Sequence, residues 1–224
     1  SVFLSRDFAL TQKQLELKLD EVRQLSEKTL EQEQRNRKIE IESRLLEAEN
    51  KRKTKELEEA RQLQLSMLPD AMPKTPHLDI SVFMETATEV GGDYYDYSNQ
   101  DNGLVLALGD ATGHGMKAGI MVAAAKSYFH TLAGEPDQTR MMHSMSAGIR
   151  NMRLHMMYMG MSVLRCRGRE AELIAAGMPP VLWYRKQPDC VERITLKSLP
   201  LGTPARFPYE NRRIQLEPGD VLFM

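Results

Sequence analysis

The first third of the chain has the apolar spacing of one long helix. Residues 8–67 contain no proline or glycine, and Glu, Lys, Arg, Gln and Leu dominate their composition. At 1.5 Å per residue this helix would be about 90 Å long, so it cannot bury its apolar side chains against a core of its own. Three groups of residues follow four-three spacing: Leu15, Leu19 and Val22; Ile41, Leu45 and Ala48; and Leu57, Ala60 and the polar Gln64.

This spacing predicts a two-stranded coiled coil with a weak middle. Between the apolar groups the seam positions fall on Ser26, Thr29, Glu33 and Asn36, which interrupt the heptad. The alternatives are a single solvated helix and a disordered charged linker, but helices this long rarely persist alone. We therefore expect a homodimer through this helix, with the helices parallel. We also hypothesise that the polar seam lets the helices change register to carry a signal.

A proline-rich stretch follows the helix. Pro69 disfavours helical geometry in Leu68, so the helix should end there. Three parts are expected: a coiled-coil helix over residues 1–68, a hinge over 69–76 and a globular domain over 77–224. The chain begins abruptly and ends in an apolar run typical of a strand interior, so we expect it to be a piece of a longer protein.

The globular part alternates between strand-like and helix-like patterns. Helices are predicted over residues 116–132 and 138–155, the first with a core-facing stripe made of Ile120, Ala123, Ala124, Ser127 and Tyr128. The many methionines of this region indicate core filling, with a promiscuous binding surface as the alternative. Strands are predicted over 77–84, 91–97, 104–108, 157–165, 172–176, 181–184 and 212–216, and from 221. This order indicates an α+β fold with two antiparallel sheets and helices packed outside.

Two glycine-rich turns carry aspartates at strand ends. Asp93 follows Gly91 and Gly92, and Asp110 is the second residue of the run Gly109-Asp110-Ala111-Thr112-Gly113-His114-Gly115. A hairpin turn over residues 99–103 places the two aspartates on neighbouring antiparallel strands, where their carboxylates can converge. Glycines let the backbone bring a peptide carbonyl beside a carboxylate, and such oxygen ligands hold a hard divalent cation. The alternative is that Asp110 caps the following helix and the glycines only form a tight turn.

Composition and charge limit the classes of protein to which the chain can belong. The formal net charge of −1 gives no strong field for nucleic acid or a membrane surface, so no nucleic-acid partner is expected. Cys166 and Cys190 are too few for a disulfide framework and have no Cys-x-x-Cys spacing, which fits a reducing cytoplasm. No signal peptide or membrane-spanning apolar run is visible. The expected location is cytoplasmic, with attachment of a longer parent protein to a membrane sensor left open.

Together these motifs resemble a known family. The residues that carry the resemblance are 63–69, 91–96, 109–115, 176–180 and 218–222, in that order. They are similar to the metal-dependent serine/threonine phosphatases of the type-2C (PPM) class, and within it to the bacterial SpoIIE/RsbU-like branch. The likeness runs from about Leu63 to the C-terminus. The N-terminal helix resembles the linkers that join such domains to upstream sensors, some of them embedded in membranes.

The resemblance implies a fold and a metal site. The fold would be an antiparallel β-sandwich flanked by helices, with two Mn²⁺ or Mg²⁺ ions at one edge. Asp110 would bridge both ions, Asp93 would hold one, and the carbonyl of Ala111, where many relatives have Gly, would add a ligand. Four residues would lie outside the metal ligands and shape or support the loop around them: Gly92, Gly113, His114 and Gly115. His114 could act as a general acid, or have the structural or outer-shell role that its place in a glycine turn favours.

The resemblance also implies a reaction. Two ions would lower the pKa of a bridging water and clamp the phosphoryl oxygens of a phosphoserine or phosphothreonine on a protein. In this branch the usual substrate is a STAS-type partner-switching regulator. No Cys-x5-Arg loop offers an alternative phosphatase chemistry. Many relatives carry a His where this chain has Met178, so the loop around it is assigned no catalytic role.

In one respect the sequence differs from the family's pattern. In the family, the strand after Gly-Asp-Val-Leu normally continues to a Thr/Ser-Asp-Gly that supplies a further metal ligand, and this sequence stops at Met224. We therefore expect the 224 residues as written to bind the second metal poorly and to be inactive or weak. The alternative function is a catalytically silent, phosphatase-like module that dimerises and docks partners.

Overall fold

The computed structural model describes residues 2–85, 90–101, 103–204 and 207–224, with the backbone alone for 2–11. The chain divides into two compact units, Ser1–Lys55 and Glu56–Met224. Helix α1 (Val2–Ser66) runs through the first unit and ends in the second. None of the described helices combines the length and apolarity needed to cross a lipid bilayer.

Helix α1 confirms the predicted long helix and ends two residues before Leu68. Every described side chain from residue 12 to residue 55 is exposed, including the seam residues Leu19 (61% exposed) and Leu45 (65%). Ion pairs along the helix, such as Arg44 with Glu40 at 2.7 Å, are solvent-exposed and of a kind that contributes little stability. From residue 12 to residue 55 the apolar seam is therefore uncovered in the single chain.

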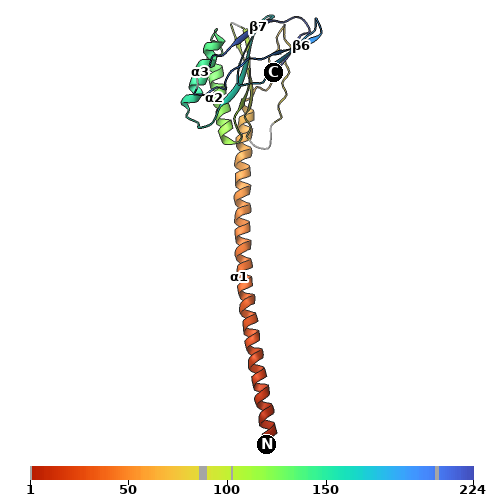
Figure 1. The fold of residues 1–224 in the computed structure, drawn as a ribbon, viewed down its shortest axis with the longest axis vertical. Helices are drawn as coiled ribbons and strands as arrows, with labels where there is room; N and C mark the ends of the chain where they lie inside the picture. Colours follow the sequence, from red (N-terminus) through yellow and green to blue (C-terminus); the bar gives the residue numbers. More distant parts are fainter. Residues whose placement is uncertain (1, 86–89, 102, 205–206) are drawn as a thin grey trace. The chain divides into compact units, whose positions relative to one another are not determined.

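The second unit contains two antiparallel sheets (Figure 1). One has five strands in the order β1-β2-β3-β4-β7, and the other has three in the order β6-β5-β8. Their bounds are β1 (Asp93–Gln100), β2 (Gly103–Ala111), β3 (Met159–Arg167), β4 (Glu170–Ala176), β5 (Val181–Arg185), β6 (Cys190–Ile194), β7 (Asn211–Gln215) and β8 (Val221–Phe223).

Two apolar layers hold this unit together. Helices α2 (Met116–Leu132) and α3 (Gln138–Asn151) lie side by side against one face of the five-stranded sheet (Figure 1). The three-stranded sheet packs on the other face, around Leu173 and Trp183. Strand β3 serves both layers, because Val163 faces the helices and its neighbour Leu164 faces the second sheet. The predicted α+β sandwich flanked by helices is confirmed, with α2 and α3 both on the five-stranded sheet.

Methionines fill the helix layer. Met141, Met142 and Met145 of α3 and Met121 of α2 are completely buried, which confirms core filling for these four. Met156, which follows α3, is 79% exposed.

The turn between α2 and α3 is attached to the sheet by a buried arginine. Arg165 of β3, which is 2% exposed, donates from Nη1 to the Pro136 carbonyl at 2.9 Å. Its Nη2 donates to the carbonyls of Ala133 at 3.1 Å and Glu135 at 2.6 Å. The guanidinium thus satisfies carbonyls just beyond the C-terminal end of α2 that would otherwise lack partners.

The predicted core face of α2 is wrong by about one position. The buried stripe comprises Ala118, Met121, Val122, Ala125 and Phe129. Ile120 is 44% exposed, Ser127 is exposed, and the other members of the predicted stripe are only partly buried. In a helix so rich in alanine and methionine, two adjacent stripes have nearly equal apolarity, so periodicity alone does not separate them.

Three further element predictions need correction. Residues 77–84 alternate like a strand but form none: Leu78 packs against the second core while Phe83 is 88% exposed. Strand β6 was missed because its side chains are mostly exposed or polar, and only Ile194 is buried. Helix α3 ends at Asn151, four residues early, because Arg153 and Met156 take positive φ angles of 55° and 59° that a right-handed helix does not allow.

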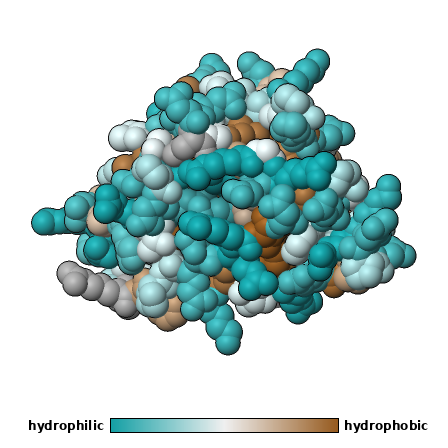
Figure 2. All heavy atoms as spheres, turned by 90° about the horizontal axis from the view of Figure 1, so that it is seen from above, coloured by the Kyte–Doolittle hydropathy of each residue, from teal (hydrophilic) through white to brown (hydrophobic). Residues whose placement is uncertain are grey.

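Polar side chains cover one face of the second unit. Figure 2 shows this face, which is mostly hydrophilic with small hydrophobic areas between polar groups. This is the pattern of a solvated surface.

The assignment of the α2 faces predicts unequal effects of two neighbouring substitutions. Met121→Ala should lower the free energy of unfolding by about 2–5 kcal/mol, because it leaves a cavity in the helix layer. Ile120→Ala should cost less than about 1 kcal/mol, because the side chain is largely solvated. Urea unfolding followed by fluorescence of Trp183, the one tryptophan of the sequence, measures both. Equal losses would show that the face assignment is wrong.

Candidate metal-binding site

The register of the β1–β2 hairpin places two aspartates directly opposite each other. Asp93, the first residue of β1, is the Cα partner of Asp110, near the end of β2. Directly paired residues project from the same face of a sheet, so both carboxylates lie on one side. Both residues are exposed. The prediction that they lie on neighbouring antiparallel strands is confirmed.

This proximity changes the acidity of Asp110. Partial desolvation of its carboxyl group raises the pKa of Asp110, and the negative charge of Asp93 raises it further. Like charges directly opposite each other on two strands destabilise a sheet. A divalent cation between the carboxylates would remove this repulsion, since hard cations take carboxylate oxygens as ligands.

Gly92 leaves room for a third oxygen. A Cβ atom at Gly92 would clash with the carbonyl oxygen of Ala111 and would lie 2.9 Å from Asp110 Oδ1. These two oxygens therefore converge on the space beside Gly92, and the Ala111 amide donates to the Gly92 carbonyl at 2.9 Å. Ala111 keeps an ordinary φ angle, since among described non-glycine residues only Arg153, Met156 and Asp189 have positive φ.

Hydrogen bonds hold the loop after Asp110 from two sides. The Thr112 amide donates to the Tyr158 carbonyl at 2.9 Å, and the Gly115 amide donates to the Val90 carbonyl at 2.8 Å. Gly113 and Gly115 have φ angles of 83° and 77°, a region that disfavours residues with a Cβ atom. His114 is exposed between them, where either role considered for it remains a prediction.

The alternative role for Asp110 as a helix cap is wrong. The N-cap residue of α2 is Gly115, and no side chain accepts a capping hydrogen bond there. By contrast, Asp137 does cap α3, accepting from the amides of Thr139 and Arg140. The carboxylate of Asp110 is therefore not committed to the helix that follows it.

Sequence reasoning missed one residue that supports the site. Gln64, in the last turn of α1 and within the second unit, is 3% exposed. Its Nε2 donates to the Gly91 carbonyl at 2.7 Å, and its Oε1 accepts from the Gly91 amide at 3.0 Å. The side-chain amide thus fixes the turn just before Asp93. The signal was present in the sequence, where Gln64 is the polar member of an apolar seam.

The donor set fits a hard divalent cation in part. Two carboxylates and one carbonyl suit Mn²⁺ or Mg²⁺ with water completing the shell. Within the described residues, no group of three or more His, Cys, Asp or Glu side chains is placed to hold a metal. Met178 lies close by, since a Cβ at Gly160, the Cα partner of Asp110, would be 2.9 Å from its sulfur. A thioether is a poor ligand for hard ions, so Met178 is not included in the donor set.

Comparison with known proteins assigns the family. The fold is shared with the SiaA-PP2C domain of Pseudomonas aeruginosa, at a TM-score of 0.51 and 22% identity over 59% of this chain and 54% of that one. The family model of Stage II sporulation protein E (SpoIIE) matches residues 100–224, more than half of the sequence. The chain therefore belongs to the SpoIIE family, in the SpoIIE/RsbU-like branch of the PPM phosphatases that the sequence motifs indicate.

Two curated relatives share parts of the sequence. Phosphoserine phosphatase RsbU of Bacillus subtilis (strain 168) is 22% identical over 177 residues, which are 75% of this chain and 51% of RsbU. Protein IcfG of Synechocystis sp. (strain PCC 6803) is 32% identical over 81 residues, which are 36% of this chain and 13% of IcfG. The chain thus spans about half of the one relative and a small part of the other.

The raised pKa of Asp110 predicts an unusual gain of stability. A carboxyl group whose pKa is higher in the folded state makes the protein less stable as pH rises through that window. Asp110→Asn should therefore raise the free energy of unfolding of the metal-free protein at neutral pH. The difference from wild type should shrink as the pH falls towards about 4, the pKa of Asp in the unfolded state. Urea unfolding at several pH values measures this.

The matched control is Asp101→Asn, which removes an exposed carboxylate at the other end of the same hairpin. Adding Mn²⁺ should reverse the order of stability, because an ion that binds only the folded wild-type protein stabilises it. An Asp110→Asn variant that is no more stable than wild type at neutral pH would contradict the assignment of repulsion at this pair.

Proposed function

We propose that this protein is a metal-dependent serine/threonine phosphatase that hydrolyses phosphoserine or phosphothreonine on a protein regulator. The observation that carries the proposal is the direct pairing of Asp93 with Asp110 beside the Ala111 carbonyl, in a chain of the SpoIIE family. The name of the relative RsbU, a phosphoserine phosphatase, supports the reaction class.

In this proposal Asp93, Asp110 and the Ala111 carbonyl would hold Mn²⁺ or Mg²⁺, and Asp110 would be the ligand shared between ions, as the family resemblance implies. When bound, the ions lower the pKa of a water molecule and polarise the phosphoryl oxygens. Asp110 suits a bridging role because its carboxylate is not engaged in capping α2. Gly92 keeps the space between the oxygens free of side-chain atoms. Gly113, His114 and Gly115 belong to the loop that follows Asp110, where His114 would orient groups around the ions or exchange a proton with solvent.

The openness of the site supports a protein substrate. Asp93, Asp110, Thr112, Gly113 and His114 are all exposed. Sites for small molecules usually enclose most of the ligand surface, whereas an exposed site accepts a phosphoryl group carried on another protein. A STAS-type partner-switching regulator is the substrate we propose, on the strength of the branch of the family to which the motifs belong.

The proposal predicts metal-dependent phosphate release. With Mn²⁺, the longest polypeptide that the gene encodes should dephosphorylate a phosphoserine-bearing STAS domain, and EDTA should abolish the activity. Asp93→Asn and Asp110→Asn should each lower kcat/KM by at least about 100-fold, because loss of outer-shell groups alone costs 10–100-fold. Asp101→Asn should have no effect.

Two results would count against the phosphatase. Activity that persists in Asp110→Asn would remove that residue from the chemistry. Binding of the STAS domain without metal-stimulated release would favour the silent docking module. The expectation that residues 1–224 alone are inactive or weak is tested by assaying that chain in parallel.

The same proposal includes control through a dimeric helix. We propose that residues 1–68 form a parallel coiled coil that connects an upstream sensor, through residues 69–76, to the catalytic domain over 77–224. Support comes from the exposed seam of α1, where Leu15, Leu19, Val22, Ile41 and Leu45 are 52–65% exposed in the single chain. Helices of this length gain most of their stability from packing of an apolar face.

The coiled coil predicts a position-specific effect on dimerisation. Ile41→Lys with Leu45→Lys should raise the dimer dissociation constant by about 100-fold or more, because both ammonium groups would be buried in the seam. The control, Ile39→Lys with Leu46→Lys, makes the same chemical change at exposed off-seam positions of α1. Sedimentation velocity compares the two variants. If both dissociate equally, the seam is assigned wrongly.

A further inference from the structure

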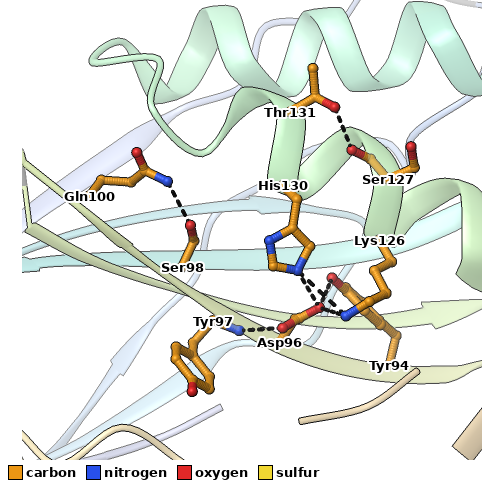
Figure 3. A network of polar contacts seen from close by, with 9 residues as sticks. All are labelled: Tyr94, Asp96, Tyr97, Ser98, Gln100, Lys126, Ser127, His130 and Thr131. Atoms are coloured by element: carbon orange, nitrogen blue, oxygen red, sulfur yellow. Dashed lines mark hydrogen bonds and ion pairs between the residues drawn. The ribbon is translucent and has the colours of Figure 1, made fainter. Parts of the chain in front are cut away.

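A buried polar cluster joins the strand that carries Asp93 to helix α2. Asp96, three residues after Asp93 on β1, is 3% exposed. Its Oδ2 lies 2.6 Å from Lys126 Nζ and 2.9 Å from His130 Nε2, both on α2, and it accepts from the Tyr94 hydroxyl at 3.1 Å. Figure 3 shows these side chains pointing toward one another across the gap between strand and helix. We call Tyr94, Asp96, Lys126 and His130 the Asp96 cluster.

The cluster leaves the buried carboxylate little freedom. Asp96 Oδ1 also accepts from the Tyr97 amide at 2.8 Å, so both oxygens have donors (Figure 3). Burial and the charge of Asp96 raise the pKa of Tyr94, which keeps its hydroxyl protonated as a donor. Removing one partner of a buried ion pair leaves an uncompensated charge and is strongly unfavourable. The pairing with Lys126 therefore favours one position of α2 along β1.

The apolar contacts of α2 alone specify this position less sharply. Three of the five buried side chains of its core stripe are Ala118, Val122 and Ala125, which are small. Burial of apolar surface is non-directional, so a shift of the helix along the sheet costs little where the side chains are short. Lys126 and His130, one helical turn apart, meet a single oxygen and so add the missing directional constraint.

The position of α2 determines the position of the candidate metal loop. Helix α2 begins at Met116, immediately after Gly115, and the Gly115 amide is bonded to the Val90 carbonyl just before the Gly91–Gly92 turn. On the other side of the loop, the Ala111 amide is bonded to the Gly92 carbonyl. Movement of α2 along β1 would strain the bond from Gly115 to Val90 directly, and through residues 112–115 it would pull on the end of β2 that carries Asp110 and Ala111.

We propose that Asp96 is a positioning residue of the candidate metal site. It acts through Lys126 and His130 to fix α2 against β1, and through α2 it fixes the loop that follows Asp110 and Ala111 at the end of β2. This inference rests on the proposed function, because it concerns affinity for the metal. Asp96 itself contributes no ligand, since its carboxylate is buried and saturated by the Asp96 cluster and the Tyr97 amide.

The test uses the variant Asp96→Asn, which keeps the size of the side chain and removes its charge. Hydrogen exchange of the metal-free protein should rise about tenfold at the amides of Ala111 and Gly115, which lie outside the Asp96 cluster. The dissociation constant for Mn²⁺, measured by electron paramagnetic resonance titration, should rise about tenfold, within the range for loss of an outer-shell group.

Two further variants separate positioning from general stability. Ser146→Ala removes a buried hydrogen bond in the α3 region that the Gly202 amide donates to Ser146 Oγ (3.1 Å), and it should leave Mn²⁺ affinity and exchange at Ala111 and Gly115 unchanged. Lys126→Gln removes the charge of a partly exposed partner and should shift both quantities in the same direction as Asp96→Asn, by a smaller factor. It keeps the proposal testable if Asp96→Asn does not fold.

The outcomes are distinct. Faster exchange confined to residues 126–130, unchanged Mn²⁺ affinity in Asp96→Asn, or equal effects of Ser146→Ala would each overturn the positioning role. If the wild-type protein itself binds no Mn²⁺, the proposed function fails and the link to metal affinity fails with it. In that case the exchange data alone decide whether Asp96 positions the loop.

Discussion

The register of the β1–β2 hairpin is the constraint on which the candidate site depends. The turn pairs Gln100 with Gly103. Seven residues before Gln100, at the start of β1, the same register places Asp93 opposite Asp110. Because side chains alternate between the faces of a strand, a slip of one residue would send one aspartate to the opposite face. The burial pattern opposes such a slip, since Tyr94 and Asp96 of β1 are buried under α2.

Several backbone contacts then turn the register into a shaped site. Gly92 provides the space, the Gly115 amide holds the loop to Val90, and Gln64 fixes the Gly91 peptide on its other side. Each of these contacts comes from a different segment of the second unit. The two carboxylates are therefore kept close together although their charges repel, as the raised pKa of Asp110 reflects. Held in this way, the pair would need little rearrangement to bind the cation of the proposed function.

The sequence was sufficient for features that are local. The absence of Gly and Pro from residues 8–67 predicted α1. The turn residues around 99–103 predicted the hairpin and with it the Asp93–Asp110 pair. Features that depend on distant partners were not accessible. Asp96 meets Lys126 and His130 at separations of 30 and 34 residues, and no pattern along the chain connects them. Residues 77–84 have the alternation of a strand, but pairing needs a neighbour that a single sequence does not identify.

Strand β7 shows how the sheet is kept from extending. It lies at one edge of the five-stranded sheet, and four of its five residues, Asn211, Arg212, Arg213 and Gln215, are polar and exposed. Charged side chains on an edge strand discourage pairing with a second molecule, because like charges would be brought together. Protection by charge is weakened by salt, whereas protection by a covering helix is not. The β7 edge, opposite β1, is therefore protected less well against pairing at high ionic strength.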